Sequence, residues 1–141
     1  MLPVCDSQQE GSHVDETIAS DSVPELPPLT NEVKNWGMLC HLSALLGFVP
    51  PFIGVVLGPL LIWLVKGKEH PFIDANGRES LNFQISMLIY SAITSVTICI
   101  GIGLFLLPAL WIIDVILIVV AAVKASGGAV YRYPLTIRLI S

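Results

Sequence analysis

Residues 108–125, PALWIIDVILIVVAAVKA, decide how the whole chain has to be interpreted. Apart from Asp114 and Lys124, this stretch is apolar. A helix needs roughly 20 apolar residues to cross the hydrocarbon core of a bilayer, so the stretch predicts a transmembrane helix with Pro108 in its first turn. A carboxylate at the centre of such a helix costs roughly 2.5–3.5 kcal/mol. Asp114 is therefore predicted to face other helices and not lipid.

The distribution of charge divides the chain into two parts. Seven of the eleven acids lie within residues 1–32, which contain no Lys or Arg. A segment rich in Ser, Pro and acids cannot bury enough apolar surface to offset its ordering entropy, and it lacks the basic and apolar regions of a signal peptide. We predict an acidic, disordered cytoplasmic tail over residues 1–31 and a membrane domain over residues 32–141.

Two further apolar stretches precede residue 108. One runs from Trp36 to Val65 and is interrupted by Pro50–Pro51, which removes two backbone donors and disfavours helix. We predict two short helices here, 32–49 and 51–66, joined in a hairpin; one kinked span is the alternative. The other stretch, from about Leu81 to Leu107, predicts a helix that begins near Asn76, with that residue as its cap and Glu79 in the capping box.

The predicted fold class is therefore all-α: a polytopic membrane protein with four transmembrane helices, two short and two longer. Basic residues concentrate in loop 66–79 and segment 124–141. The positive-inside rule places both segments on the cytoplasmic side. We expect a multi-pass protein of the bacterial plasma membrane, with both termini in the cytoplasm.

Small residues at four-residue spacing indicate where helices approach closely, because burial does not drive helix association within lipid. We expect them to serve packing within the chain, with a dimerisation face as the alternative, since a GxxxG pattern alone is a weak signal. These candidate packing residues are Ser43, Gly47, Gly54, Gly58, Ser91 and Ser95.

The helix after residue 76 is unusually polar, and its polar residues do not fall on one stripe. Hydrogen bonding between helices is the predicted use, and a polar lining for a passage is the alternative. Counting depth from the helix ends, we predict that Asp114 pairs with His41 or with the hydroxyl of Tyr90. The predicted intramembrane polar cluster consists of Asp114, His41, Tyr90, Ser91 and Thr94.

The C-terminal sequence YRYPLTIRLI, residues 131–140, is too short to span and is interrupted by Pro134. We predict that it lies at the cytoplasmic interface, with its aromatic residues at headgroup depth and its arginines near anionic lipid. Docking onto loop 66–79, with Asp74 or Glu79 pairing with an arginine, is the alternative. The predicted interfacial residues are Tyr131, Arg132, Tyr133 and Arg138.

Several motifs together resemble one family. They are His41-Leu42-Ser43, the proline-broken hairpin, Pro71-Phe72 through Asp74, Glu79–Ser86 and Tyr131-Arg132-Tyr133-Pro134. Over residues 33–141 the chain looks like a group of small bacterial membrane proteins of unestablished function. They are distantly related to the twenty-kilodalton subunit of the protein-import translocon of the chloroplast inner envelope. The resemblance implies four membrane helices and no catalytic residues, and it does not imply import activity.

No pattern in the sequence indicates an enzyme, a cofactor, a metal site or nucleic-acid binding. A nucleotide loop, a zinc spacing, a serine elbow and an H-E-x-x-H motif are all absent. We expect an accessory or structural membrane protein that contacts the lipid bilayer and packs with another membrane protein or with further copies of itself. A small oligomeric carrier or pore with Asp114 in its polar path is the alternative.

Overall fold

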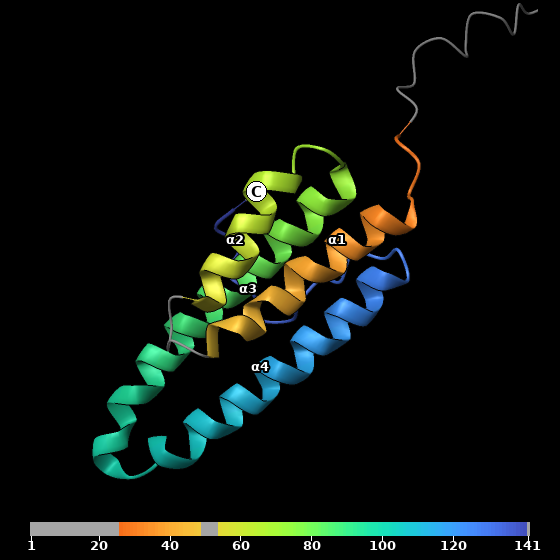
Figure 1. The fold of residues 1–141 in the computed structure, drawn as a ribbon. Coiled ribbons are helices and arrows are strands. Elements are labelled where there is room, and N and C mark those ends of the chain that lie inside the picture. Colours follow the sequence, from red (N-terminus) through yellow and green to blue (C-terminus); the bar gives the residue numbers. More distant parts are fainter. Residues whose placement is uncertain (1–25, 49–53, 141) are drawn as a thin grey trace, which may run out of the picture.

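The computed structural model describes residues 26–48 and 54–140 (Figure 1). Within these ranges every regular element is helical, which confirms the predicted all-helical class. The elements are α1 (Asn31–Leu42), the 3-10 helix η1 (Ser43–Phe48), α2 (Gly54–Lys66), α3 (Pro71–Val96), the 3-10 helix η2 (Thr97–Ile100) and α4 (Gly103–Ser126). Most of the predicted tail lies in residues 1–25, outside the described residues.

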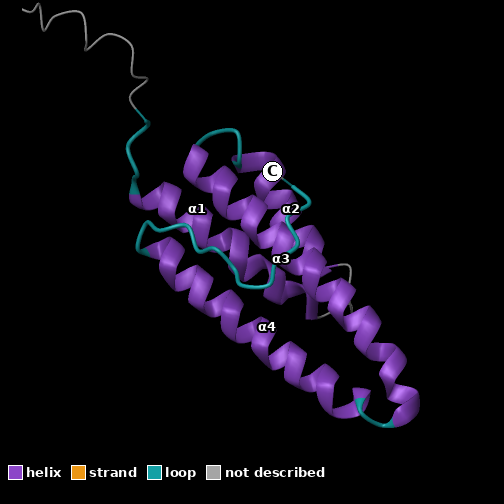
Figure 2. Ribbon diagram, turned by 180° about the vertical axis from the view of Figure 1, so that it is seen from behind, coloured by secondary structure: helices purple, strands orange, loops and turns teal. Residues whose placement is uncertain are grey.

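Helices α3 and α4 form two long antiparallel arms, joined through η2 and a turn at Gly101, which has a left-handed φ of 79°. Helix α1 packs against both arms, and α2 packs against η1 and α3. Figures 1 and 2 show that α1 and α2 accompany only one half of the arms. The other half, with η2 at its tip, projects beyond them. The bundle thus has a thick end and a thin end.

Both long helices begin earlier than predicted. The backbone N–H of Phe72 donates to His70 Nδ1 over 3.0 Å, and Pro71 occupies the first turn, so α3 starts five residues before Asn76. Asn76 does not cap the helix, because its amide is used inside the bundle. Helix α4 starts at Gly103 and not at Pro108, which lies within it.

The first apolar stretch forms separate helices, α1 with η1 and then α2, and not one kinked span. Pro50–Pro51 lie outside the described residues. The two sides meet at glycines: a Cβ placed on Gly54 would lie 2.6 Å from Cα of Gly47, and one on Gly58 would overlap the carbonyl oxygen of Ser43. Only residues without a side chain permit this approach.

Two segments are long and apolar enough to cross a membrane, Pro71–Ile100 and Gly103–Ser126. Only 17% of the most apolar part of α4 is buried in the bundle. A core helix of a water-soluble protein would be mostly buried, whereas here large side chains such as Ile93, Leu104 and Phe105 are exposed. The exposed apolar surface therefore fits contact with lipid.

The Gly58 contact predicts a specific sensitivity to one methyl group. Gly58→Ala should lower stability by about 1–3 kcal/mol, because the added Cβ overpacks the contact with Ser43. Gly127→Ala is the matched control, since a Cβ there meets its nearest atom at 3.4 Å, an ordinary contact. Thermal unfolding in detergent measures both. Equal midpoints for the two variants would show that the crossing of η1 and α2 is not tight.

Candidate functional site: the polar interior around α3

One row of polar side chains on α3 faces α1 and α4. Asn76, Ser80 and Gln84 follow one another at four-residue spacing and are all buried. Asn76 Oδ1 lies 3.0 Å from His41 Nε2. Ser80 Oγ donates to the carbonyl of Cys40 over 2.9 Å, and Gln84 Nε2 lies 3.4 Å from Asp114 Oδ1. This row ties three helices together through hydrogen bonds.

A second row on α3 binds the backbone of the C-terminal strap, which we define as residues 129–140. Asn82 Oδ1 accepts from the N–H groups of Leu139 and Ile140 over 3.0 and 2.8 Å, and Asn82 Nδ2 donates to the carbonyl of Ile140 over 2.8 Å. Ser86 Oγ accepts from Ile137 N over 2.8 Å, and Tyr90 Oη donates to the Leu135 carbonyl over 2.6 Å.

The second row solves a problem of the strap itself. An extended segment has no internal hydrogen bonds, and buried backbone groups without partners are costly. Four-residue spacing on α3 places Asn82, Ser86 and Tyr90 along one side of the helix. Their side chains replace the partners that a helix or sheet would supply. The polar residues of α3 therefore serve two rows, which is why they do not form one stripe.

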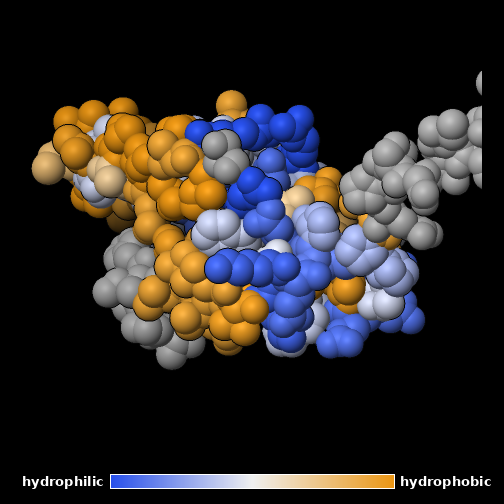
Figure 3. Space-filling model, turned by 90° about the horizontal axis from the view of Figure 1, so that it is seen from above, coloured by the Kyte–Doolittle hydropathy of each residue, from blue (hydrophilic) through white to orange (hydrophobic). Residues whose placement is uncertain are grey.

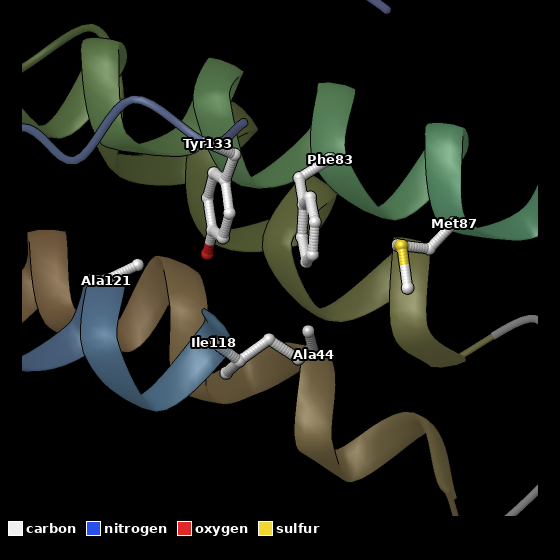
Figure 4. Close-up of a cluster of buried hydrophobic side chains, with 6 residues drawn as sticks. All are labelled: Ala44, Phe83, Met87, Ile118, Ala121 and Tyr133. Carbon is white, nitrogen blue, oxygen red and sulfur yellow. The ribbon is translucent and has the colours of Figure 1, made fainter. Parts of the chain in front are cut away.

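Tyr133 fixes the strap in the hydrophobic core. It is 4% exposed and stacks on Phe83, with ring centroids 3.9 Å apart and planes 8° apart. Figure 4 shows both rings between α3 and α4, near Ala44, Ile118 and Ala121. Burial raises the pKa of the Tyr133 phenol, with smaller contributions from nearby acidic groups, so the phenol keeps its proton. Tyr133 is therefore a core residue of the bundle, and its depth in a membrane stays a prediction.

The hydroxyl of Tyr133 completes a buried chain of hydrogen bonds. Asn76 Nδ2 donates to the carbonyl of Phe72 over 2.8 Å, which turns Asn76 Oδ1 towards His41. His41 Nε2 must then carry the proton of that contact. In a neutral imidazole Nδ1 is the acceptor, and it receives the Tyr133 hydroxyl over 2.9 Å. The chain is satisfied with His41 neutral.

Asp114 is 6% exposed and faces the bundle. Its partner in the structure is Gln84, and not His41 or Tyr90 as predicted. His41 is occupied by Asn76 and Tyr133, and Tyr90 binds the strap. The shift has a simple cause: α3 starts about five residues earlier than predicted, so the residue opposite Asp114 moves by a similar number along α3.

The remaining members of the predicted cluster lie elsewhere. Ser91 and Thr94 are half-buried, further along α3 in its thin half. Among the packing candidates, the structure brings together Ser43, Gly47, Gly54 and Gly58. It does not add the remaining serines of α3 to that contact. Ser95 is exposed, and its hydroxyl donates to the Ala92 carbonyl of its own helix over 2.7 Å.

The arginines of the strap converge on one acid. The Nε atoms of Arg132 and Arg138 lie 3.9 and 3.6 Å from Oε1 of Glu79. Tyr131 is half-buried and meets Tyr133 edge-on, with centroids 5.1 Å apart. Docking of the strap with Glu79 as the acid, the alternative left open above, is thus the arrangement observed. Asp74 is used differently, by Arg78 and by Trp63 Nε1 at 2.7 Å.

Across residues 26–48 and 54–140, no group of three or more His, Cys, Asp or Glu side chains is placed to hold a metal ion. The buried polar groups just described bind one another or the backbone. Their arrangement joins different elements of the bundle. What this site does chemically is hold α1, α3, α4 and the strap in one register.

Comparison with known proteins gives one family. Residues 32–140 match the model of the MamF/MmsF magnetosome magnetite crystal formation protein family. This match overturns the resemblance to relatives of the chloroplast translocon subunit. The proline-broken hairpin, one of the motifs that carried that resemblance, is also expected wherever two short membrane helices pack closely. No curated protein and no solved structure matches the chain significantly.

The second polar row predicts how the strap responds to mutation. Asn82→Leu should release residues 137–140, because three backbone groups lose their partners at about 1–3 kcal/mol for each buried group. Limited proteolysis in detergent measures release of the strap. Ser95→Ala is the control, since that hydroxyl bonds only within its own helix. Unchanged protease resistance of Asn82→Leu would show that Asn82 is not needed to hold the strap.

Proposed function

The chain belongs to the magnetosome magnetite crystal formation protein family, and from this we propose that it acts in magnetite crystal formation as a membrane accessory protein. Its role in this proposal is to pack with other membrane components and not to catalyse a reaction. Two observations support the proposal. One is the distribution of charge along the bundle, and the other is that the buried polar side chains bind one another or the backbone.

We place the bundle across the magnetosome membrane with its thick end in the cytoplasm. The arms α3–η2 and α4 cross the membrane, and the hairpin of α1, η1 and α2 enters from the cytoplasmic side and returns to it. Six of the seven basic residues lie at or beyond the helix ends that meet there, and the seventh, Arg78, lies two turns inside α3. Figure 3, the view from above, shows hydrophilic residues gathered beside hydrophobic surface. The positive-inside rule then makes both termini cytoplasmic.

The observation that carries the proposal is the absence of charge from the thin end. Between Lys34 and Lys66 the sequence contains no Asp, Glu, Lys or Arg, and between Glu79 and Lys124 it contains only Asp114, which is buried. In the proposed orientation the thin end faces the compartment of the crystal. It offers no exposed charged group to iron ions or mineral there, so an effect on the crystal has to pass through packing within the membrane.

The carrier alternative is less well supported by the interior. The polar side chains that would line a passage, including His41, Gln84 and Ser86, are already hydrogen-bonded within the bundle. The groove along α4 lined by Pro108, Trp111 and Ile112 is apolar. Asp114 remains the residue on which a carrier would depend, because intramembrane acids are commonly functional.

Native cysteine labelling tests the proposed orientation. In a Cys5→Ser background, exposed Cys99 marks the thin end and buried Cys40 should stay unreactive. In vesicles that present the cytoplasmic face, a membrane-impermeant maleimide should label Lys68→Cys and leave Cys99 unlabelled until the membrane is opened. Labelling of Cys99 before opening would contradict the orientation.

Substitutions of Asp114 separate the accessory role from the carrier. Asp114→Asn should preserve both assembly and crystal size, because an amide still hydrogen-bonds Gln84. Asp114→Leu should impair both, because it leaves Gln84 unpaired at about 1–3 kcal/mol. Crystal size in cells and ion flux into liposomes are the measurements. Flux through the wild-type chain that Asp114→Asn abolishes would support the carrier instead.

A further inference from the structure

The charged groups at the thick end differ in how many partners of opposite charge they have. Lys66 pairs with Glu69 at 2.9 Å, and Arg78 pairs with Asp74. Glu79, by contrast, is shared by Arg132 and Arg138, so this cluster carries one surplus positive charge. Both arginines belong to the strap, whose backbone is anchored on α3. Two cations are therefore held beside one carboxylate by the fold.

The geometry leaves both guanidinium groups available. Their Nε atoms lie 3.9 and 3.6 Å from Glu79 Oε1, longer than an N–H···O hydrogen bond. The side chains of Arg132 and Arg138 are 72% and 47% exposed, whereas that of Glu79 is 13% exposed. The carboxylate sits behind the pair and the arginines face outwards. Oε2 of Glu79 is buried and has no hydrogen-bond partner among the described residues, so the acid contributes charge more than hydrogen bonds.

We propose that Arg132 and Arg138 bind the phosphate of an anionic phospholipid headgroup, with Glu79 as the positioning residue. Guanidinium groups match phosphate oxygens through paired N–H donors, and Arg is preferred over Lys where that geometry matters. The membrane placement also puts the site at headgroup depth. Glu79 is the last charged residue of α3, and the last turn of α4 carries Lys124. This inference rests on the membrane placement proposed above.

Glu79 separates a built site from general attraction between a basic surface and anionic lipid. Glu79→Gln makes the thick end more positive. General electrostatic attraction then predicts stronger binding of anionic lipid. A built site predicts weaker binding, because the two guanidinium groups lose the charge that holds them together. The sign of the change decides between the two accounts.

The experiment uses the full chain in nanodiscs of phosphatidylcholine, with and without phosphatidylglycerol. Apparent affinity for phosphatidylglycerol is read from the rise in thermal midpoint as its fraction increases. Arg132→Gln and Arg138→Gln should each lower it about fivefold. Arg132→Lys should lower it less, and Glu79→Gln should lower it as well. Lys68→Gln, an exposed cation at the same end but outside the cluster, is the matched control and should leave it nearly unchanged.

Protease resistance of the strap in phosphatidylcholine alone shows that each variant remains docked. An equal loss in Lys68→Gln, or a gain in Glu79→Gln, would overturn the proposal. So would an equal midpoint rise with inorganic phosphate and no phosphatidylglycerol, because the ligand would then be free phosphate. Loss of the response after deletion of residues 2–25, with the arginines intact, would assign it to the acidic tail. Cysteine labelling tests the orientation separately. The orientation and the lipid site can therefore fail independently of each other.

Discussion

A segment that crosses the surface of a bundle without forming a helix must find partners for its backbone, and this requirement shapes the rest of the structure. The strap obtains those partners from Asn82, Ser86 and Tyr90 of α3. Helix α3 consequently carries polar residues on a surface that an ordinary membrane helix would fill with apolar ones. Its other row, from Asn76 to Gln84, binds polar groups of α1 and α4, which are the His41 side chain, the Cys40 carbonyl and the Asp114 carboxylate.

These two rows leave few buried polar groups free to bind an ion or a substrate. A satisfied buried network specifies one arrangement, because each displaced group would be left without a partner. Neutral His41 between Asn76 and Tyr133 is an example, since both ring nitrogens are in use. Because the buried polar groups already bind one another, the interior serves packing. Such an interior suits an accessory protein better than a carrier. What remains free is at the surface, as lipid-facing side chains and the arginines of the thick end.

Features that depend on composition and short-range chemistry were predictable from the sequence. The helical class, the division of the first apolar stretch into separate helices and the burial of an acid at helix centre follow from the free-energy costs of local features. The start of α3 was missed because a histidine cap before Pro71 is a weaker signal than an Asn with a capping-box Glu. That one error displaced the depth count and gave Asp114 the wrong partner. The strap was missed because alternation in residues 131–140 fits an interface as well as a buried segment. The sequence does contain one relevant signal, the four-residue spacing of Asn82, Ser86 and Tyr90. It indicates a binding surface only once the strap is known to lie along that side of α3.

The central claim, that side chains of α3 hold the backbone of the strap against the bundle, is tested most directly by amide hydrogen exchange in a bilayer. The amides of Ile137, Leu139 and Ile140 should exchange slowly, because each donates to Ser86 or Asn82. Between them, the amide of Arg138 makes no hydrogen bond in the described structure and should exchange faster. Exchange of all four amides at the rate of a free peptide would contradict the account.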